Sequence, residues 1–124
     1  MAGEVRAVFI NSLKAENVIT FVRGLNQPNG LAMRNGSLYV AEISRIIIFD
    51  DIESTLKSMV QKKMKDAEMS AEIQYRVWYK DFPNETHHGW KFIRFSPDGD
   101  LFVPVGAPCN VCYRDDPRFS TSEF

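Results

Sequence analysis

The sequence of 124 residues lacks several features that would place it in a functional class at once. Its apolar runs are short, such as Ile46–Phe49, whereas a membrane-spanning helix needs about 20 apolar residues. The N-terminus has no basic start followed by a long apolar stretch, so no secretory signal is evident. The 15 basic and 16 acidic residues nearly cancel, and phosphate neutralisation needs a basic surplus. We therefore expect no membrane span and no nucleic-acid partner, and the compartment stays unknown.

Residues with metal-binding or redox chemistry are also few. Cys109 and Cys112 form a C-x-x-C, which fits a small disulfide ring, a redox pair or half of a zinc site. Zinc needs two further ligands, and the adjacent His87 and His88 would point to opposite sides of an extended chain. A redox C-x-x-C opens a helix in a βαβ context, which is missing here. The sequence therefore predicts no metal site, and either a local disulfide or two unpaired thiols, depending on the compartment.

What the sequence does contain is a series of short apolar segments separated by turn-forming residues. Asn35-Gly36 is a strong hairpin signal, and a second turn, Ser96-Pro-Asp-Gly99, separates two later segments. The alternation of apolar and polar residues over 73–79 predicts a half-buried strand. The segments that we predict as strands are 17–22, 31–33, 38–41, 46–49, 73–79, 90–95 and 101–105.

One segment, about 50–69, has helical rather than strand periodicity. Its apolar residues fall on one helix face, and Asp50 with Glu53 resembles an N-terminal capping pair. The opposite face carries several lysines, which fit either a membrane-surface helix or a solvated face. We favour the solvated face because the overall charge is nearly neutral. The apolar residues of this helix are Ile52, Leu56, Met59, Val60, Met64 and Ala67.

An internal repeat indicates the architecture. Met33-Arg-Asn-Gly-Ser-Leu-Tyr-Val-Ala41 resembles Phe95-Ser-Pro-Asp-Gly-Asp-Leu-Phe-Val-Pro104, and in each unit a glycine turn precedes a strand. Propeller blades recur at about 40–50 residues, and the inserted helix explains the longer spacing here. We therefore predict a mainly β fold with one region, 1–124: a partial β-propeller of about two blades with one inserted amphipathic helix. Two blades do not close a ring of about four to eight. We thus expect a fragment, a truncated gene product or one part of an assembly.

The stretch His87-His-Gly-Trp-Lys-Phe-Ile-Arg-Phe-Ser-Pro-Asp-Gly-Asp-Leu-Phe-Val-Pro-Val-Gly-Ala-Pro-Cys-Asn-Val-Cys112 is the most informative motif. With Leu25-Asn-Gln-Pro-Asn-Gly-Leu-Ala-Met33 and Leu38-Tyr-Val-Ala-Glu42, it resembles the glucose/sorbosone dehydrogenase family, and in particular its L-sorbosone dehydrogenase branch. The resemblance covers about 24–116. It implies a six-bladed propeller that oxidises sugars or related aldehydes with pyrroloquinoline quinone and calcium.

The resemblance also implies roles for single residues. His88 matches the family's catalytic histidine, which takes a proton from the substrate hydroxyl, and His87 is the second choice. Without the resemblance, both histidines read as polar loop residues. The quinone and calcium sites of the family lie in segments that have no counterpart here, so cofactor-binding residues are unknown. Family members are often periplasmic or secreted.

Two functions follow as expectations. The first is a part of a quinone-dependent sugar or aldehyde dehydrogenase, inactive alone, because half a cofactor pocket neither positions nor tunes the quinone. The alternative is a non-catalytic propeller that serves as an interaction scaffold, since a fold does not fix a function.

Overall fold

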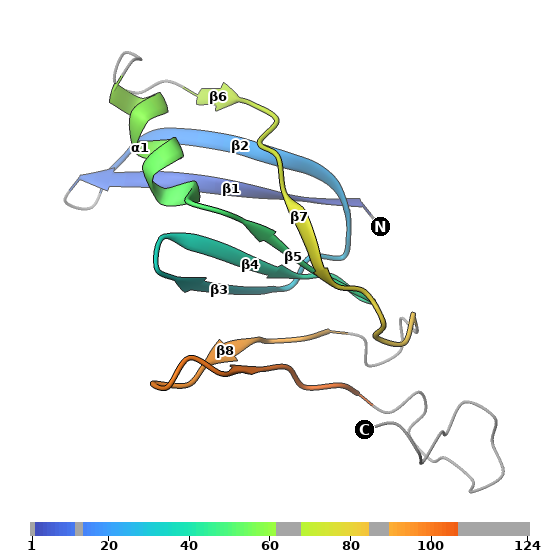
Figure 1. The fold of residues 1–124 in the computed structure, drawn as a ribbon. Coiled ribbons are helices and arrows are strands. Elements are labelled where there is room, and N and C mark those ends of the chain that lie inside the picture. Colours follow the sequence, from blue (N-terminus) through green and yellow to red (C-terminus); the bar gives the residue numbers. More distant parts are fainter. Residues whose placement is uncertain (1, 12–13, 62–67, 85–89, 107–124) are drawn as a thin grey trace, which may run out of the picture.

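The structure of the protein, a computed structural model, describes residues 2–11, 14–61, 68–84 and 90–106. These residues form three sheets and one helix, which confirms the mainly β prediction. Figure 1 shows the sheets one below another, with the first hairpin at the top and the last at the bottom. No helix in the described ranges has the length and hydrophobicity that crossing a membrane requires.

The middle sheet has four antiparallel strands in chain order, β3-β4-β5-β7. The Asn35-Gly36 turn joins β3 to β4, and both turn residues have positive φ, 50° and 80°, as the hairpin signal predicted. All four residues of β5 are buried because other layers cover both faces of this strand. The strands are β3 (Gly30–Arg34), β4 (Ser37–Ala41), β5 (Ile46–Phe49) and β7 (Arg76–Tyr79).

The first sheet was only partly foreseen. Its strands are β1 (Ala2–Asn11), β2 (Lys14–Asn26) and β6 (Glu68–Ser70), in the order β1-β2-β6. The sequence predicted only the 17–22 part of β2 and no strand before it. β1 pairs with β2 along most of its length, and exposed positions alternate with covered ones along it. The exposed Val8 and Ile10 are apolar, so the sequence does not show this alternation.

The helix α1 (Ile52–Gln61) corrects the predicted 50–69 helix in two ways. The helix ends before Glu68, because from there the chain forms β6, which pairs with the edge of β2 in parallel. Asp50 is not the cap: its carboxylate accepts hydrogen bonds from Arg76, at 2.7 and 3.2 Å. Instead, the Asp51 carbonyl accepts the first helical bond, and the Gly36 carbonyl accepts the Glu53 N–H.

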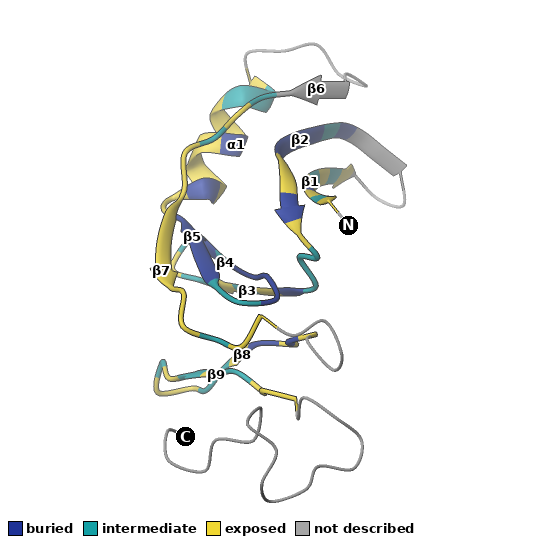
Figure 2. Cartoon of the chain, turned by 90° about the vertical axis from the view of Figure 1, so that its right-hand side faces the viewer, coloured by how far each residue is buried: buried dark blue, intermediate teal, exposed yellow. Residues whose placement is uncertain are grey.

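The apolar face of α1 completes the larger core, as predicted. Ile52 and Leu56 are buried, and Met59 and Val60 pack partly against the same cluster, whereas Met64 and Ala67 lie outside the described residues. This cluster joins the first sheet, one face of the middle sheet and α1. Figure 2 shows buried residues along β2, β4 and β5. The other members of the core are Val5, Ile19, Phe21, Val22, Leu25, Leu38, Val40, Ile47 and Phe49.

Strand β7 corrects the predicted half-buried strand over 73–79. All four of its residues are exposed (Figure 2), although the Trp78 ring meets the Tyr39 ring with 5.7 Å between centroids. β7 is one of the two outer strands of the middle sheet, and among the described strands it pairs only with β5. Alternation therefore predicted the strand but not its burial, because burial depends on which layer covers the strand.

The last sheet is the hairpin of β8 (Arg94–Phe95) and β9 (Leu101–Phe102), shorter than the predicted strands 90–95 and 101–105. The predicted turn is present: Gly99 has a φ of 95°, and its N–H donates to the Ser96 carbonyl at 3.0 Å. One face of this hairpin packs on the middle sheet around the buried Ile93.

Candidate functional site

A buried polar cluster lies at one end of the middle sheet, where β3 begins and β4 ends. The loop before β3 is fixed to the end of β4 by the Asn29 N–H, which donates to the Ala41 carbonyl at 3.1 Å. The Asn29 side-chain oxygen accepts the N–H of Lys91 at 3.2 Å, and this bond ties the start of the last sheet to the same loop. Segments about 60 residues apart in sequence therefore meet here.

Glu42 is the buried charge of this cluster, with its residue only 2% exposed. One carboxylate oxygen accepts the Asn26 backbone N–H at 2.5 Å, and the other binds the guanidinium of Arg45. Arg45 also lies over the ring of Tyr75, with 5.7 Å between the guanidinium carbon and the ring centroid. With both carboxylate oxygens bound in this way, Glu42 fixes the loop between β4 and β5 against the end of β2.

Lys91 is the buried cation. Its ammonium donates to the Ile43 carbonyl and lies 5.5 Å from the centroid of the Phe82 ring. Burial lowers the pKa of Lys91 below its ordinary value of 10.5, because the charged form loses hydration. The backbone of Lys91 also lies against β3, since a Cβ on Gly30 would sit 1.8 Å from the Lys91 carbonyl oxygen.

Sequence reasoning did not foresee this cluster. Glu42 and Arg45 are three residues apart, but that spacing indicates an ion pair only on a helix, and here the two residues follow a strand. The available signal was a charged pair directly after the apolar segment 38–41, where a strand ends at a buried turn.

The four residues predicted for chemistry are not placed by the structure. His87 and His88, and likewise Cys109 and Cys112, lie outside the described residues. The histidine assignment and the disulfide therefore stay predictions. The structure does fix the chain two residues beyond His88, where the Trp90 indole N–H donates to the Gln27 side-chain oxygen at 3.4 Å. The Asn29 amide nitrogen is buried there, without a hydrogen-bond partner among the described residues.

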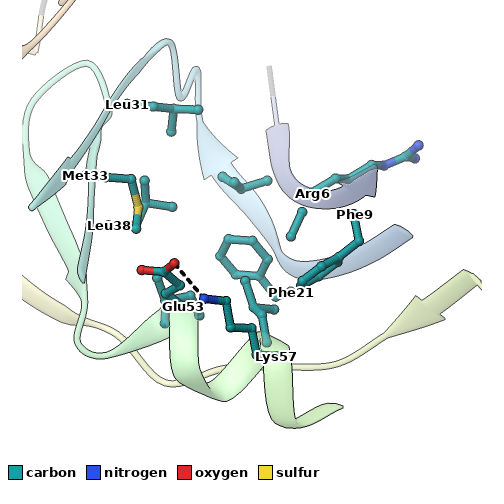
Figure 3. A pocket seen from close by; sticks show the side chains of 12 residues that line it. Arg6, Phe9, Phe21, Leu31, Met33, Leu38, Glu53 and Lys57 are labelled. Atoms are coloured by element: carbon teal, nitrogen blue, oxygen red, sulfur yellow. Dashed lines mark hydrogen bonds and ion pairs between the residues drawn. The ribbon is translucent and has the colours of Figure 1, made fainter. Parts of the chain in front are cut away.

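A second feature is an apolar cleft of about 350 Å³ between β1, the β3–β4 hairpin and α1 (Figure 3). The charged groups at this cleft are mostly paired: Lys57 binds Glu53 at 3.0 Å, and Arg6 binds Glu4. The cleft therefore offers apolar surface and no free cation for an anionic ligand. Its lining residues are Val5, Arg6, Ala7, Phe9, Phe21, Leu31, Met33, Leu38, Ile52, Glu53, Leu56 and Lys57.

We expect the substitution Glu42→Gln to lower the free energy of unfolding by about 2 kcal/mol, because an amide cannot accept both hydrogen bonds of the buried carboxylate. The matched control is Glu53→Gln, which breaks an exposed i,i+4 pair with Lys57 and is expected to cost about 0.5 kcal/mol or less. Urea denaturation followed by circular dichroism measures both. Equal losses in the two variants would show that Glu42 contributes no more than a surface residue.

Lys91 gives a pH-dependent prediction. Because its pKa is lowered in the folded state, the unfolded chain binds more protons between that folded-state pKa and 10.5. The free energy of unfolding should therefore rise with pH in this alkaline window, while below it Lys91 contributes no slope. Denaturation curves of the parent and of Lys91→Met, compared over the same pH range, isolate this contribution. Parallel curves for the two proteins would contradict it.

Comparisons of the chain with known protein families, with curated proteins and with solved structures give no match. The residues and geometry described above are therefore the basis for the function proposed next.

Proposed function

We propose that this chain forms part of a β-propeller of the glucose/sorbosone dehydrogenase type. The observation that carries the proposal is the way in which the two repeated hairpins stack. Gly30 of the first hairpin lies against the Lys91 carbonyl, just before the second, and the Arg34 side chain of the first hairpin reaches Gly99 in the turn of the second. Two equivalent hairpins that lie side by side in the same direction, each beginning a sheet, match the packing of successive propeller blades.

Ring contacts between the two hairpins support the same arrangement. Tyr39 and Phe95 meet edge to face with 4.8 Å between their ring centroids, and the Arg34 guanidinium lies 5.6 Å from the Phe95 centroid. Phe95 begins the second repeat, and Arg34 and Tyr39 belong to the first. Residues of the two sequence repeats thus contact one another directly.

Within this fold, we assign His88 as the base that takes the proton from a substrate hydroxyl, with His87 as the second choice. The anchoring of Trp90 and Lys91 to the 27–29 loop supports this assignment. A base needs a rigid support, and these bonds hold the chain directly after the histidines at the end of the sheet where the polar cluster lies.

The described residues do not fit the quinone or the calcium ion. In those ranges, no group of three or more His, Cys, Asp or Glu residues converges to hold a metal. The two cations of the cluster, Arg45 and Lys91, already bind Glu42 and the Ile43 carbonyl. We therefore derive no step through either group, and we expect no turnover from this chain alone.

The alternative is a propeller scaffold without catalysis. The large exposed apolar side chains of the last hairpin, such as Phe92 and Phe102, favour it, because such surface binds other protein surface.

A chimera separates the two functions. Residues 24–116 would replace the equivalent pair of blades in a glucose/sorbosone-type dehydrogenase, whose other blades bring the quinone and calcium sites. We expect the chimera to reduce a dye with sugars or sugar aldehydes, and His88→Ala to lower kcat about 10²–10⁴-fold, as the loss of a general base does. His87→Ala is the matched control and should retain most of the activity.

The quinone's absorption shows whether the chimera is loaded. A folded, quinone-loaded chimera whose activity is unchanged by His88→Ala, or that has no activity at all, would contradict the catalytic assignment and leave the scaffold.

A further inference from the structure

The apolar cleft between β1, the β3–β4 hairpin and α1 is an open space whose walls are each fixed in place. The Glu53 N–H at the start of α1 donates to the Gly36 carbonyl of the hairpin turn at 3.1 Å. Beside it, the Asp51 N–H donates to the Ser37 hydroxyl oxygen at 3.0 Å, and β1 is held by its pairing with β2. Protein interiors leave few voids larger than a water molecule, so a space of about 350 Å³ between fixed walls has the size of a small-molecule site.

The walls of the cleft are apolar and partly aromatic. Figure 3 shows Leu31 and Met33 of β3 on one side and Phe9 and Phe21 on the other. The Phe21 ring is held by its edge-to-face contact with Phe49, at 5.1 Å between centroids, so this wall is set before any ligand arrives. Leu31 and Met33 are 56% and 50% exposed, and a molecule in the cleft would cover this apolar surface.

The charged groups at the cleft favour a neutral ligand. Lys57 and Glu53 of α1 form an ion pair of 3.0 Å at one end of the cleft (Figure 3). The Arg6 guanidinium points away from the cleft and binds Glu4. All three charged side chains among the described lining residues are thus paired, and an ionised group placed among the apolar walls would lose hydration without compensation.

The volume limits the size of the ligand. An enclosed apolar cavity of about 150 Å³ holds one benzene molecule. The cleft therefore has room for about two rings, and a further ring can lie over Leu31 and Met33 at the open side. Rings fit these walls because aromatic side chains pack well in edge-to-face or offset contacts, and a methionine sulfur packs well at a ring edge.

We propose that this cleft binds a neutral, apolar aromatic molecule of about two to three rings, and that the Glu53–Lys57 pair makes it discriminate against anions of the same shape. Glu53 determines this specificity because it neutralises Lys57 at the end of the cleft. The site lies on the face of the middle sheet opposite to β8–β9, and it does not rest on the proposed dehydrogenase function.

Two fluorescent probes with the same ring skeleton test the class of ligand. N-phenylnaphthylamine is neutral and becomes fluorescent when it leaves water, and anilinonaphthalene sulfonate adds one sulfonate to the same rings. We expect the neutral probe to saturate at one molecule per chain with a dissociation constant on the order of 10 µM. The sulfonated probe should bind about tenfold more weakly. No saturable binding of the neutral probe, or equal or tighter binding of the sulfonate, would overturn the proposal.

Substitutions at the open side of the cleft locate the probe. Met33→Glu places a carboxylate beside the rings and should weaken binding of the neutral probe about tenfold, whereas Met33→Leu keeps an apolar side chain and should retain binding. Val8→Glu is the matched control, because Val8 is also 50% exposed and apolar but does not line the cleft. All three variants should keep the circular dichroism spectrum of the parent, since both positions are exposed.

The β8–β9 hairpin is the competing location for an apolar probe. Phe92 is 66% exposed there, and Phe92→Ser should leave binding of the neutral probe unchanged. Carbon-labelled methionine methyl groups give a direct readout by NMR: the Met33 signal, identified by its loss in Met33→Leu, should shift as the probe saturates. A Met33 signal that stays in place at saturation, or binding that is lost in Phe92→Ser and kept in Met33→Glu, would overturn the proposal.

Glu53→Gln tests the specificity role of the ion pair. The substitution frees Lys57, so the sulfonated probe should bind about two- to fivefold more tightly, the size of an exposed charge contact. The neutral probe should be unaffected, and the double variant Glu53→Gln, Lys57→Gln should lose the gain. An unchanged affinity of the sulfonated probe for Glu53→Gln would refute the role of the pair.

The two proposals fail separately. The chimera carries residues 24–116 and therefore lacks β1, one wall of the cleft, so its activity does not depend on this site. Probe binding in turn involves neither His88 nor the polar cluster around Glu42. An active chimera without probe binding to the chain would refute only this inference, and probe binding with an inactive chimera would refute only the catalytic assignment.

Discussion

The substitution Gly30→Ala is expected to destabilise the fold by about 3 kcal/mol, the upper part of the range for overpacked interiors. The reason is a collision with backbone: the added Cβ would lie 1.8 Å from the Lys91 carbonyl oxygen, 3.0 Å from the Lys91 carbonyl carbon and 3.1 Å from the Ala41 Cβ. A flexible side chain can turn away from such a contact, but these atoms belong to two sheets that meet here. To relieve the collision, the last hairpin must move away from β3, which breaks the bond between the Asn29 side chain and the Lys91 N–H.

Gly24→Ala is the matched control, because the same methyl group meets nothing within 4 Å there. Gly24 has a φ of 75°, so its substitution costs only the strain of the left-handed conformation, about 1 kcal/mol. Urea denaturation at one protein concentration measures both losses. If Gly30→Ala cost no more than Gly24→Ala, the close contact between the two sheets would be absent in solution.

The parts of the fold that the sequence predicted are those whose cause is local. The turn at Asn35-Gly36 needs positive φ at two adjacent positions, and few residue pairs other than Asn-Gly tolerate this. The turn at Gly99 follows the same reasoning, and so do the buried strand Ile46–Phe49 and the apolar face of α1. In each case, a few neighbouring residues determine the conformation without help from the rest of the chain.

The parts that the sequence did not predict depend on distant segments. The helix was extended to residue 69 because its apolar spacing continues, but Glu68–Ser70 pairs with the edge of β2, about 50 residues away. Asp50 resembled a helix cap, but its carboxylate instead accepts a hydrogen bond from Arg76 of β7. β1 was missed because its exposed positions Val8 and Ile10 are apolar, which hides the period of two on which strand prediction depends.

The same distinction holds for the candidate site. The motif around His88 was evident from residue types alone, but the polar cluster at the end of the middle sheet was not. The buried Glu42 accepts the N–H of Asn26 at the end of β2, 16 residues earlier, and the buried Lys91 donates to the Ile43 carbonyl, 48 residues earlier. Such partners are set by how the sheets stack, so no local pattern reveals them.

The second large effect is expected for Phe49→Ala in the centre of the larger core, where we predict a loss of about 4 kcal/mol. The Phe49 side chain is fully buried, and its ring meets the edge of the Phe21 ring with 5.1 Å between centroids and the Tyr75 ring at 5.4 Å. Phe21 belongs to the first sheet and Phe49 to the middle sheet, so truncation opens a cavity at the junction of two layers.

Phe49→Leu is the control for this cavity, because it keeps most of the apolar volume and loses mainly the two ring contacts, which is expected to cost about 1 kcal/mol. The difference between the two variants in urea denaturation then measures how much filling the junction contributes to the free energy of unfolding.

Nearly equal losses would mean that the first sheet moves in to close the cavity. In that case the first sheet is held less by this core than by the pairing of its own strands. A large difference instead makes the junction the contact that fixes the first sheet over the middle one. The apolar cleft depends on that contact, because it exists only while β1 is held beside β3.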